Sequence, residues 1–287
     1  MKKIFRFISA FFVLIPVFFS CEASSRPESG MTEIRTAKGA VQAPTDDAAA
    51  DDSEEKTVYD VYLLIGQSNM AGRGTLLLSD MNEEPENVYL LGAENVPVQA
   101  THPFNQYSTI RKSLSMQQMG PGYSFSLKVL EAHPDRKILL VCNARGGTSI
   151  TEWAKGSTYY SEAVRRTREA LKYGELKAIL WHQGCADSGK RVGQYMELLK
   201  AFVSSLRADL NAREVPFIAG ELARWRDTSP NFNTMINTIS DNIPFSACVS
   251  SEGLGMLKDE TDPHFNRESQ ITLGRRYADK VLELAKY

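Results

Sequence analysis

The 287-residue sequence has few of the residues that bind metals. It contains four histidines and four cysteines, and neither set has the paired spacing of a metal site. A phosphate-binding loop and a dinucleotide fingerprint are also missing from the sequence, so we expect neither a metal nor another cofactor. A formal net charge of -2 at pH 7 gives no broad basic surface. Binding to nucleic acid, or to an anionic membrane through charge, is therefore not expected.

The first residues have the features of an export signal. Lysine or arginine at positions 2, 3 and 6 precedes an apolar stretch, residues 11–19, that is too short to span a bilayer. Ser20 and Cys21 follow and resemble the lipobox of bacterial lipoproteins, in which the cysteine becomes the lipidated first residue of the mature chain. Residues 1–21 thus predict a lipoprotein-type signal peptide and a protein anchored to a bacterial membrane, in the periplasm or at the cell surface. A plain signal peptide and a periplasmic or secreted protein are the alternative.

Residues 22–56 are rich in Ala, Ser, Thr, Asp and Glu and contain almost no large apolar side chain. Such a segment cannot bury enough surface to offset the entropy cost of ordering, so we expect a disordered acidic tether. Membrane contact would then occur only through the lipid. The domain itself would comprise residues 57–287. Its three cysteines, Cys142, Cys185 and Cys248, argue against a full disulfide framework because their number is odd, and we predict three buried thiols.

From residue 58 onward, strand-like and helix-like segments alternate, which predicts one α/β domain with a mostly parallel sheet of five or six strands. The expected strands are residues 58–65, 87–91, 137–143, 176–181, 215–220 and 247–250. Helices are expected at 122–132, at 160–173 with Gly174 as C-cap, at 192–210, and after Asn266 as N-cap. Residues 94–120 have weak periodicity, which indicates either one wall of a substrate cleft or a surface elaboration.

Ser68 lies two positions after Gly66, where the first strand ends. Open α/β sheets bind their ligands at the carboxyl ends of the strands, so a serine here is a candidate nucleophile. The sequence does not match the G-x-S-x-G elbow, because Met70 replaces the second glycine. Taken alone, a serine after a strand is more often part of a turn or a helix cap than a nucleophile.

Other polar residues follow later strands. Gly146 and Gly147 allow a backbone to approach a ligand closely, although a plain turn explains them as well. Gln183 could direct its amide at a carbonyl oxygen on which negative charge develops, whereas His182 beside a tryptophan is more typical of a packed side chain. Near the C-terminus, His264 lies close to carboxylates that could fix its tautomer.

Four blocks of sequence in this order resemble the sialate O-acetylesterase-like family. This family belongs to the SGNH hydrolase superfamily and is related to carbohydrate esterase family six, which includes acetylxylan esterases. The resemblance extends over residues 58–285. The blocks are residues 66–70 (Gly-Gln-Ser-Asn-Met), 145–149 with Trp153, 181–184 (Trp-His-Gln-Gly), and 264–266 with 273–278.

The resemblance implies a three-layer α/β/α, flavodoxin-like SGNH hydrolase fold. It also implies that Ser68 is the nucleophile and His264 the general base. The oxyanion hole would comprise the Ser68 N–H, the N–H of Gly147 or Gly146, and the Gln183 side chain. The acetylated carbohydrate substrate, of sialate or xylan type, would be met by loops around the site. Three residues are candidates for contact with it: Arg73, Arg145 and Trp153. Plain packing explains Trp153 equally well, and loop stabilisation is the alternative for each arginine.

Two positions depart from the family pattern. The acid usually lies three residues before the histidine, where this chain has Thr261; we expect Asp262 to replace it, with Asp259 as the alternative. The usual glutamate after Gln-Gly is Cys185 here, and a cysteine nucleophile is a minor alternative. The leading hypothesis is a serine esterase that removes O-acetyl groups from carbohydrates. A non-catalytic glycan-binding lipoprotein and a lipase-like enzyme for long acyl chains are the competing hypotheses.

Overall fold

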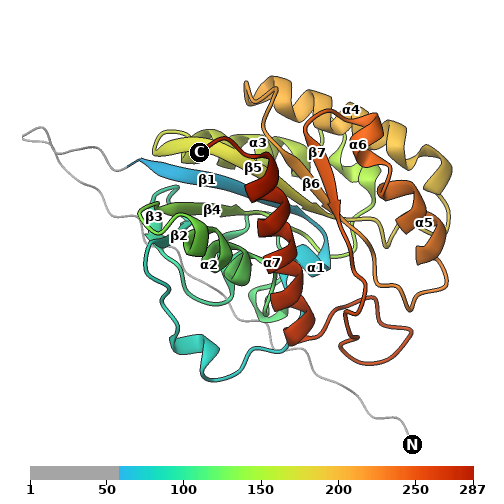
Figure 1. The fold of residues 1–287 in the computed structure, drawn as a ribbon, viewed down its shortest axis with the longest axis horizontal. Coiled ribbons are helices and arrows are strands. Elements are labelled where there is room, and N and C mark those ends of the chain that lie inside the picture. The colour runs from blue at the N-terminus through green and yellow to red at the C-terminus, as the bar shows by residue number, and fades with distance from the viewer. Residues whose placement is uncertain (1–57) are drawn as a thin grey trace, which may run out of the picture. The chain divides into compact units, whose positions relative to one another are not determined.

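A computed structural model describes residues 58–287 of the chain. Seven strands form one sheet in the order β3-β2-β4-β1-β5-β6-β7, with β1 at its centre (Figure 1). Each neighbouring pair is parallel except β2 and β3. The strands are β1 (Tyr59–Gly66), β2 (Val88–Leu91), β3 (Pro97–Gln99), β4 (Ile138–Cys142), β5 (Gly174–His182), β6 (Phe217–Gly220) and β7 (Ser246–Val249).

The sheet therefore has seven strands where five or six were predicted. The six predicted strands are all present, and their ends lie within two residues of the expected positions. The additional strand, β3, lies in the segment of weak periodicity and pairs antiparallel with β2. All three of its residues are half-buried, so β3 lacks the alternation of buried and exposed side chains by which a strand is recognised.

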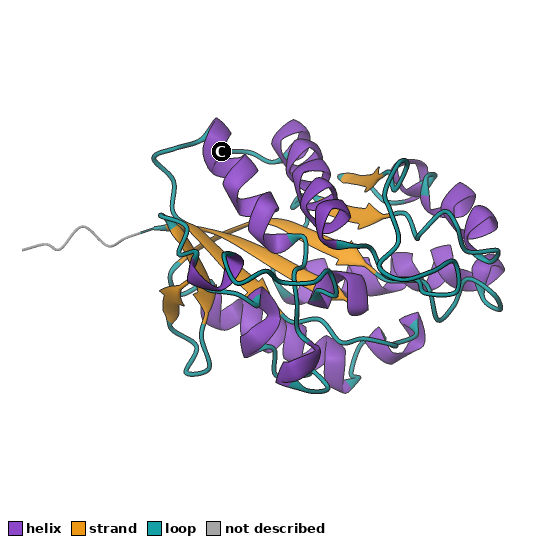
Figure 2. Ribbon diagram, turned by 90° about the horizontal axis from the view of Figure 1, so that it is seen from below, coloured by secondary structure: helices purple, strands orange, loops and turns teal. Residues whose placement is uncertain are grey.

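Helices cover both faces of the sheet, which gives three layers (Figures 1 and 2). On one face lie α2 and α7, and on the other α3, α4, α5 and α6. The α-helices are α1 (Ser68–Ala71), α2 (Gly122–Ala132), α3 (Thr158–Ala170), α4 (Val192–Asp209), α5 (Ser229–Ile236), α6 (Ile239–Asn242) and α7 (Arg267–Leu284). The short 3-10 helices are η1 (Asp80–Asn82), η2 (Phe104–Tyr107), η3 (Leu114–Met116) and η4 (Ile150–Trp153).

The central strand β1 contributes to two hydrophobic cores. Val61, Leu63 and Ile65 pack on the side of α3 and α4, whereas Tyr62 and Leu64 pack on the side of α2 and α7. Successive side chains of a strand point to opposite faces, so a strand covered on both sides is apolar throughout. This burial explains why the apolar run before Gly66 has no polar alternation, and it fixes the position of the chain that follows.

All four predicted helices are present. The expected helices at 122–132 and 192–210 are α2 and α4, and the Asn266 side chain caps α7 by accepting from the Ser269 N–H at 2.9 Å. The prediction for Gly174 was wrong, because α3 ends at Ala170 and Gly174 begins β5. A Cβ at Gly174 would lie 1.8 Å from the Tyr59 carbonyl oxygen, so glycine is needed there for close strand pairing.

The three cysteines of the domain were predicted to be buried thiols. All three are thiols, but only one of them is buried. Cys142, Cys185 and Cys248 are free thiols, as expected. Cys142 is buried, but Cys185 and Cys248 are partly exposed. Cys185 follows the end of β5, and Cys248 lies in β7, the strand at one edge of the sheet.

The predicted signal peptide (residues 1–21), the lipidation site Cys21 and the acidic tether (residues 22–56) lie outside the described residues. Among residues 58–287, no helix combines the length and the apolar character needed to cross a bilayer.

Candidate active site

The carboxyl end of β1 places Ser68 at the edge of the sheet. Gly66 has a φ of +129°, and a Cβ there would lie 2.4 Å from the carbonyl oxygen of His182 in β5. Only glycine therefore lets the two strands stay paired to their ends. Gln67 occupies the N-cap position of α1, so Ser68 is the first helical residue and its N–H has no partner within the helix.

Ser68, His264 and Asp262 are joined by hydrogen bonds. The Ser68 Oγ lies 2.9 Å from His264 Nε2. On the other side of the ring, His264 Nδ1 lies 2.5 Å from Asp262 Oδ1, which also accepts from the His264 backbone N–H at 3.1 Å. A carboxylate at Nδ1 keeps the proton on that nitrogen and leaves Nε2 free to accept from the serine hydroxyl.

The alternative acid, Asp259, does not contact His264. Its Oδ1 accepts from the backbone N–H and the hydroxyl of Thr261, at 2.9 and 2.6 Å. Its carbonyl oxygen accepts from the Asp262 N–H at 3.0 Å. Asp259 thus forms the turn that presents Asp262, and the geometry favours the shorter spacing expected from the sequence.

The surroundings of His264 favour its neutral form. Burial lowers the pKa of His264, the nearby Asp262 carboxylate raises it, and the Arg73 guanidinium lowers it again. The net direction is downward from the ordinary value of 6.5. At neutral pH the ring is therefore unprotonated and able to accept a proton from Ser68.

Asn69 connects the nucleophile side of the site to the histidine loop. Its Nδ2 donates to the Pro263 carbonyl oxygen at 3.0 Å, and its Oδ1 accepts from the Phe265 N–H at 3.2 Å. The peptide groups on both sides of His264 are thereby held by the neighbour of Ser68. Asn69 belongs to the Gly-Gln-Ser-Asn-Met block, but no role was predicted for it from the sequence. Its position directly after Ser68 was the feature that could have indicated one.

The turn that contains Gly146 packs against Ser68. A Cβ at Gly146 would lie 3.3 Å from Ser68 Cβ and 2.7 Å from Arg73 Nη2, so Gly146 packs directly against the serine. Gly147 has a φ of +79° and neighbours the Lys112 ammonium group. Within residues 58–287, the N–H groups of Ser68, Gly146 and Gly147 donate to no protein acceptor. They are free to donate to an oxygen of a ligand.

Gln183 is close to this region, but its amide is already engaged. Its Nε2 donates to the Thr148 carbonyl oxygen and to Asp187 Oδ2, both at 2.7 Å, and its Oε1 accepts from the Tyr195 hydroxyl at 2.7 Å. An amide nitrogen has two hydrogens, so none remains for an oxyanion. The expected donor role of Gln183 therefore does not agree with the structure, in which it holds the Gly147–Thr148 turn.

Trp153 was expected to contact substrate, and the structure contradicts this expectation. The side chain is 0% exposed, and its Nε1 donates to Thr148 Oγ1 at 3.0 Å. Its ring packs edge to face on Trp181, with the centroids 5.3 Å apart. A ring enclosed by aromatic neighbours cannot stack on a sugar, so Trp153 belongs to the core.

The two arginines have different surroundings. Arg73 donates to the Gly72 and Met116 carbonyl oxygens, at 2.5 and 2.8 Å, and lies close to Ser68 and His264. Arg145 donates to the Ile110 carbonyl oxygen at 2.6 Å, and its guanidinium carbon lies 5.4 Å from the Tyr159 ring centroid. Arg145, which precedes Gly146 in the chain, and Tyr159 line a pocket of 510 Å³ together with Thr109 and Ile110.

Residues 94–120 form a wall beside the strand ends of β4 and β1. Asn105 exchanges hydrogen bonds with Ala144, donating to its carbonyl oxygen and accepting from its N–H, both at 3.0 Å. Ser108 donates to Asn143 Oδ1 at 3.0 Å. The segment is thus fastened directly before Arg145 and Gly146, and its Thr109 and Ile110 line a pocket with Arg145.

Two further residues at the end of β5 are structural. Burial lowers the pKa of His182 to about 4, and its Nδ1 lies 3.1 Å from the Tyr277 hydroxyl. Burial raises the pKa of the Cys185 thiol to about 11, so the reactive thiolate does not form at neutral pH and a cysteine nucleophile is disfavoured. Over residues 58–287, no three His, Cys, Asp or Glu side chains are grouped to hold a metal ion.

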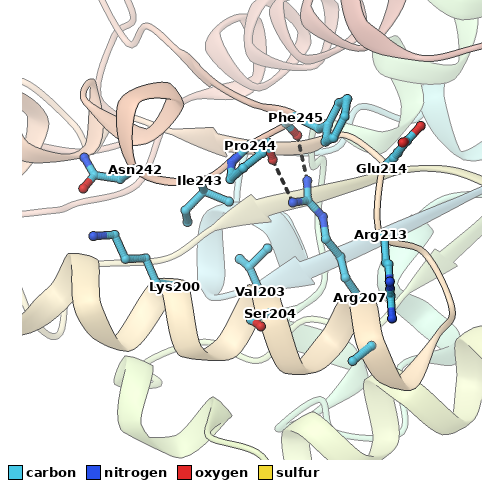
Figure 3. Close-up of a pocket in the computed structure, with 11 residues that line it drawn as sticks. Lys200, Val203, Ser204, Arg207, Arg213, Glu214, Asn242, Ile243, Pro244 and Phe245 are labelled. Carbon is cyan, nitrogen blue, oxygen red and sulfur yellow. Dashed lines mark hydrogen bonds between the residues drawn. The ribbon is translucent and has the colours of Figure 1, made fainter.

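A second large pocket lies away from Ser68 (Figure 3). It measures 690 Å³ and lies between α4 and the segments that precede β6 and β7, so it belongs to the opposite edge of the sheet. Arg207 spans it and donates to the Pro244 and Phe245 carbonyl oxygens, each at 2.7 Å (Figure 3).

A serine hydroxyl bonded to a neutral imidazole, an orienting carboxylate and free amides in the turn that packs against the serine together define a serine hydrolase. Residues 58–283 match the family described as carbohydrate esterase, sialic acid-specific acetylesterase. The chain belongs to this family, which confirms the resemblance found in the sequence. Within this class the chain is a carbohydrate acetylesterase, and no finding supports the non-catalytic alternative.

Known proteins agree with this assignment. A probable carbohydrate esterase of Arabidopsis thaliana is 30% identical over 245 residues, which are 77% of this chain and 90% of that protein. A solved structure of an A. thaliana protein is 26% identical with a TM-score of 0.68, covering 79% of this chain and 98% of that one. A carbohydrate acetylesterase from Xanthomonas citri shares the fold at 15% identity and a TM-score of 0.58, covering 79% and 56%.

Proposed function

We propose that the protein removes O-acetyl groups from carbohydrates through an acetyl-enzyme formed on Ser68. The observation that carries the proposal is the chain of contacts from Ser68 Oγ to His264 Nε2 and from His264 Nδ1 to Asp262. His264 takes the hydroxyl proton as Ser68 attacks the acetyl carbonyl, and returns it to the departing sugar oxygen. It then activates the water that hydrolyses the acetyl-enzyme.

The charge that develops on the carbonyl oxygen is stabilised by backbone amides. Ser68 N–H at the start of α1 and the N–H groups of Gly146 and Gly147 are the donors in this proposal, since none is used within the described part of the fold. Gln183 acts indirectly, because its bonds to Thr148 and Asp187 hold the turn that carries these glycines. Preorganised donors of this kind stabilise a transition state more than a ground state.

The substrate in this proposal is an acetylated carbohydrate of sialate or xylan type. Family membership supports this class of substrate. The pocket lined by Arg145 and Tyr159 combines a cation with an aromatic ring and suits a sugar. Arg73, beside the serine, would meet an acidic substituent. The aromatic contact is thereby assigned to Tyr159 in place of the buried Trp153.

The deciding experiment compares wild type with Ser68→Ala on p-nitrophenyl acetate, acetylated sialic acid and acetylated xylan fragments. Loss of the serine hydroxyl should lower kcat by about 10⁴-fold or more. Activity should fall steeply for acyl groups longer than propionyl. Wild-type hydrolysis that survives in the Ser68→Ala variant would overturn the mechanism, and rates that rise with acyl length would favour a lipase-like enzyme.

We also propose that the protein is exported and anchored through lipid at Cys21. The basic start, the short apolar stretch and Ser20-Cys21 in the sequence support this proposal. Membrane fractions of bacterial cells should contain the wild-type protein, and Cys21→Ser should release it in soluble or unprocessed form. Identical fractionation of the two proteins would argue against the anchor.

A further inference from the structure

The loop after β6 contacts the loop that carries the proposed acid and base. We call residues 221–228 the β6 loop. Its Trp225 donates from Nε1 to the Asp262 carbonyl oxygen at 2.8 Å, and Arg226 donates to the Thr261 carbonyl oxygen. Two consecutive carbonyl groups, one of them belonging to the acid itself, are therefore held by side chains from a different strand end.

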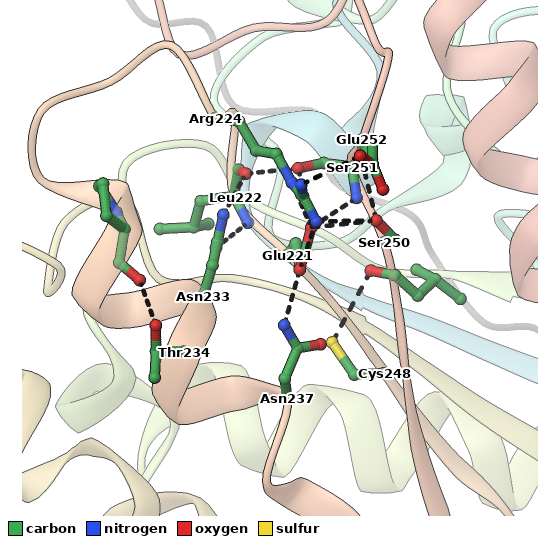
Figure 4. A network of polar contacts seen from close by, with 12 residues as sticks. Glu221, Leu222, Arg224, Asn233, Thr234, Asn237, Cys248, Ser250, Ser251 and Glu252 are labelled. Atoms are coloured by element: carbon green, nitrogen blue, oxygen red, sulfur yellow. Dashed lines mark hydrogen bonds and ion pairs between the residues drawn. The ribbon is translucent and has the colours of Figure 1, made fainter.

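The β6 loop is firmly anchored at its own base (Figure 4). Glu221 is 1% exposed and accepts from Arg224 Nε at 3.0 Å, Asn237 Nδ2 at 2.7 Å and the Ser251 N–H at 2.8 Å. Asn233 accepts from the Leu222 N–H at 2.8 Å and donates to its carbonyl oxygen at 3.0 Å. The loop thus has a fixed position from which to support a neighbour.

Trp225 also packs against the histidine loop. Its ring meets Phe265 edge to face, with centroids 5.6 Å apart. Trp153 and Trp181 are at most 1% exposed, whereas Trp225 is half-buried and lies beside the site. The side chain therefore has one apolar contact and one hydrogen bond to the segment that includes His264.

Within its own loop, Asp262 is held by its backbone N–H, which donates to the Asp259 carbonyl oxygen at 3.0 Å. Asp262 lies only two residues before His264, and its Oδ1 serves both the backbone N–H and Nδ1 of that histidine. The residues before it, 258–261, are exposed. Over residues 58–287, the carbonyl oxygens of Thr261 and Asp262 accept from no backbone N–H, so Trp225 and Arg226 are their protein partners.

We propose that Trp225 and Arg226 are positioning residues that hold the 261–262 backbone so that the Asp262 carboxylate stays on His264. This inference rests on the proposed esterase function. It assigns a role to the β6 loop that no sequence motif indicated. It also explains how a spacing one residue shorter than usual can present a carboxylate to the ring.

The test uses Trp225→Phe, which keeps a ring against Phe265 but removes the N–H donor, with p-nitrophenyl acetate as a substrate that has no sugar. We expect kcat to fall about 3- to 10-fold, the size of one lost hydrogen bond. Arg226→Met should cause a loss of similar size, and Arg226→Lys, which retains a donor, should recover part of it. Each variant is compared at equal folded fraction, measured by its Tm.

The pH profile separates positioning from simple packing. The groups that face His264 are Ser68, Asp262, Arg73 and Lys258. Of these, Asp262 raises the pKa of His264. A displaced carboxylate should therefore move the acid limb of kcat/KM to lower pH, by about a few tenths of a unit. A contact that matters only for folding would leave the limb in place, which would overturn the inference.

A double-mutant cycle with Asp262→Asn sharpens the test. If Trp225 acts through the acid, Trp225→Phe should add little to the loss caused by Asp262→Asn; additive losses would contradict the inference. An effect confined to the KM of acetylated sugars would also contradict it, because Trp225 would then contact substrate. An inactive wild type would instead refute the proposed function, so the two failures are distinguishable.

Discussion

Ser68 and His264 lie next to each other, but different parts of the structure hold them there. Ser68 follows β1, a strand buried on both faces, and Gly66 lets that strand run against β5 to its end. His264 lies in the long loop between β7 and α7, in which most residues are half-buried or exposed. That loop is held by side chains from elsewhere, among them Asn69 and Trp225. The proposed nucleophile is thus positioned by the sheet and the proposed base by individual hydrogen bonds, so single substitutions should affect the base side more strongly.

The largest effect is expected at the acid. Asp262→Asn should lower kcat by about 10⁴-fold, as loss of the orienting carboxylate does in well-studied serine proteases. Asp259→Asn is the matched control, because Asp259 contacts Thr261 and not the ring, and asparagine keeps the side-chain oxygen that accepts from Thr261; its activity should stay within about twofold of wild type. Equal losses in the two variants, measured on p-nitrophenyl acetate, would show that the acid is misassigned.

Asn69→Ala removes the link between the two sides. Two hydrogen bonds that hold the peptides around His264 are lost, and a displacement of about 1 Å in a catalytic group costs about 10²-fold in rate. We expect a kcat loss of that order. Thermal unfolding measured in parallel corrects for any loss of folded protein. Unchanged kcat would mean that the histidine loop is held sufficiently without Asn69.

Gly146→Ala tests the nucleophile side. The new Cβ would lie 3.3 Å from Ser68 Cβ and closer still to the end of Arg73, which can move away. The serine and the adjacent amides should shift by a few tenths of an ångström. We expect roughly a tenfold loss in kcat/KM. A larger loss than that of Asn69→Ala would reverse the comparison between the two sides.

The smallest effect is a shift in pH dependence. Wild-type kcat/KM should decline on the acid side with a pKa below 6.5, because protonated His264 cannot act as base. Arg73 lowers the pKa of His264, so Arg73→Gln should move the acid limb of kcat/KM to higher pH by about a few tenths of a unit. Arg145→Gln, whose guanidinium lies over Tyr159, is the control and should leave the limb unchanged.

The sequence was sufficient to predict features that follow local rules. The buried strand before Gly66, the helix expected at 192–210 and the Asn266 cap depend on residues close together in the chain, and all are present. The pairing of Ser68 with His264 joins distant elements and was anticipated through the resemblance. The pairing of His264 with Asp262 was expected from the carboxylate two residues before the ring, and both contacts are seen in the geometry.

Features that depend on competing tertiary partners were not predictable. The Gln183 amide is suited to an oxyanion by chemistry, but Thr148 and Asp187 take both of its hydrogens, and neither contact is visible in the sequence. Trp153 lies near the glycine turn in the chain, yet Trp181 and its neighbours enclose it. Gly174 looked like a helix cap because its close approach to Tyr59 comes from a strand more than a hundred residues earlier.

The wall formed by residues 94–120 is an opportunity for engineering. Asn105 and Ser108 fasten its base to the end of β4, whereas the side chains of Leu114 and Met116 at its tip are 53% and 42% exposed. Randomising positions 113–115 does not change the residues that fasten the base. It also keeps Met116, whose carbonyl oxygen accepts from Arg73. A library of variants at these positions would vary the approach to Ser68, while Ser68, His264 and Asp262 stay unchanged.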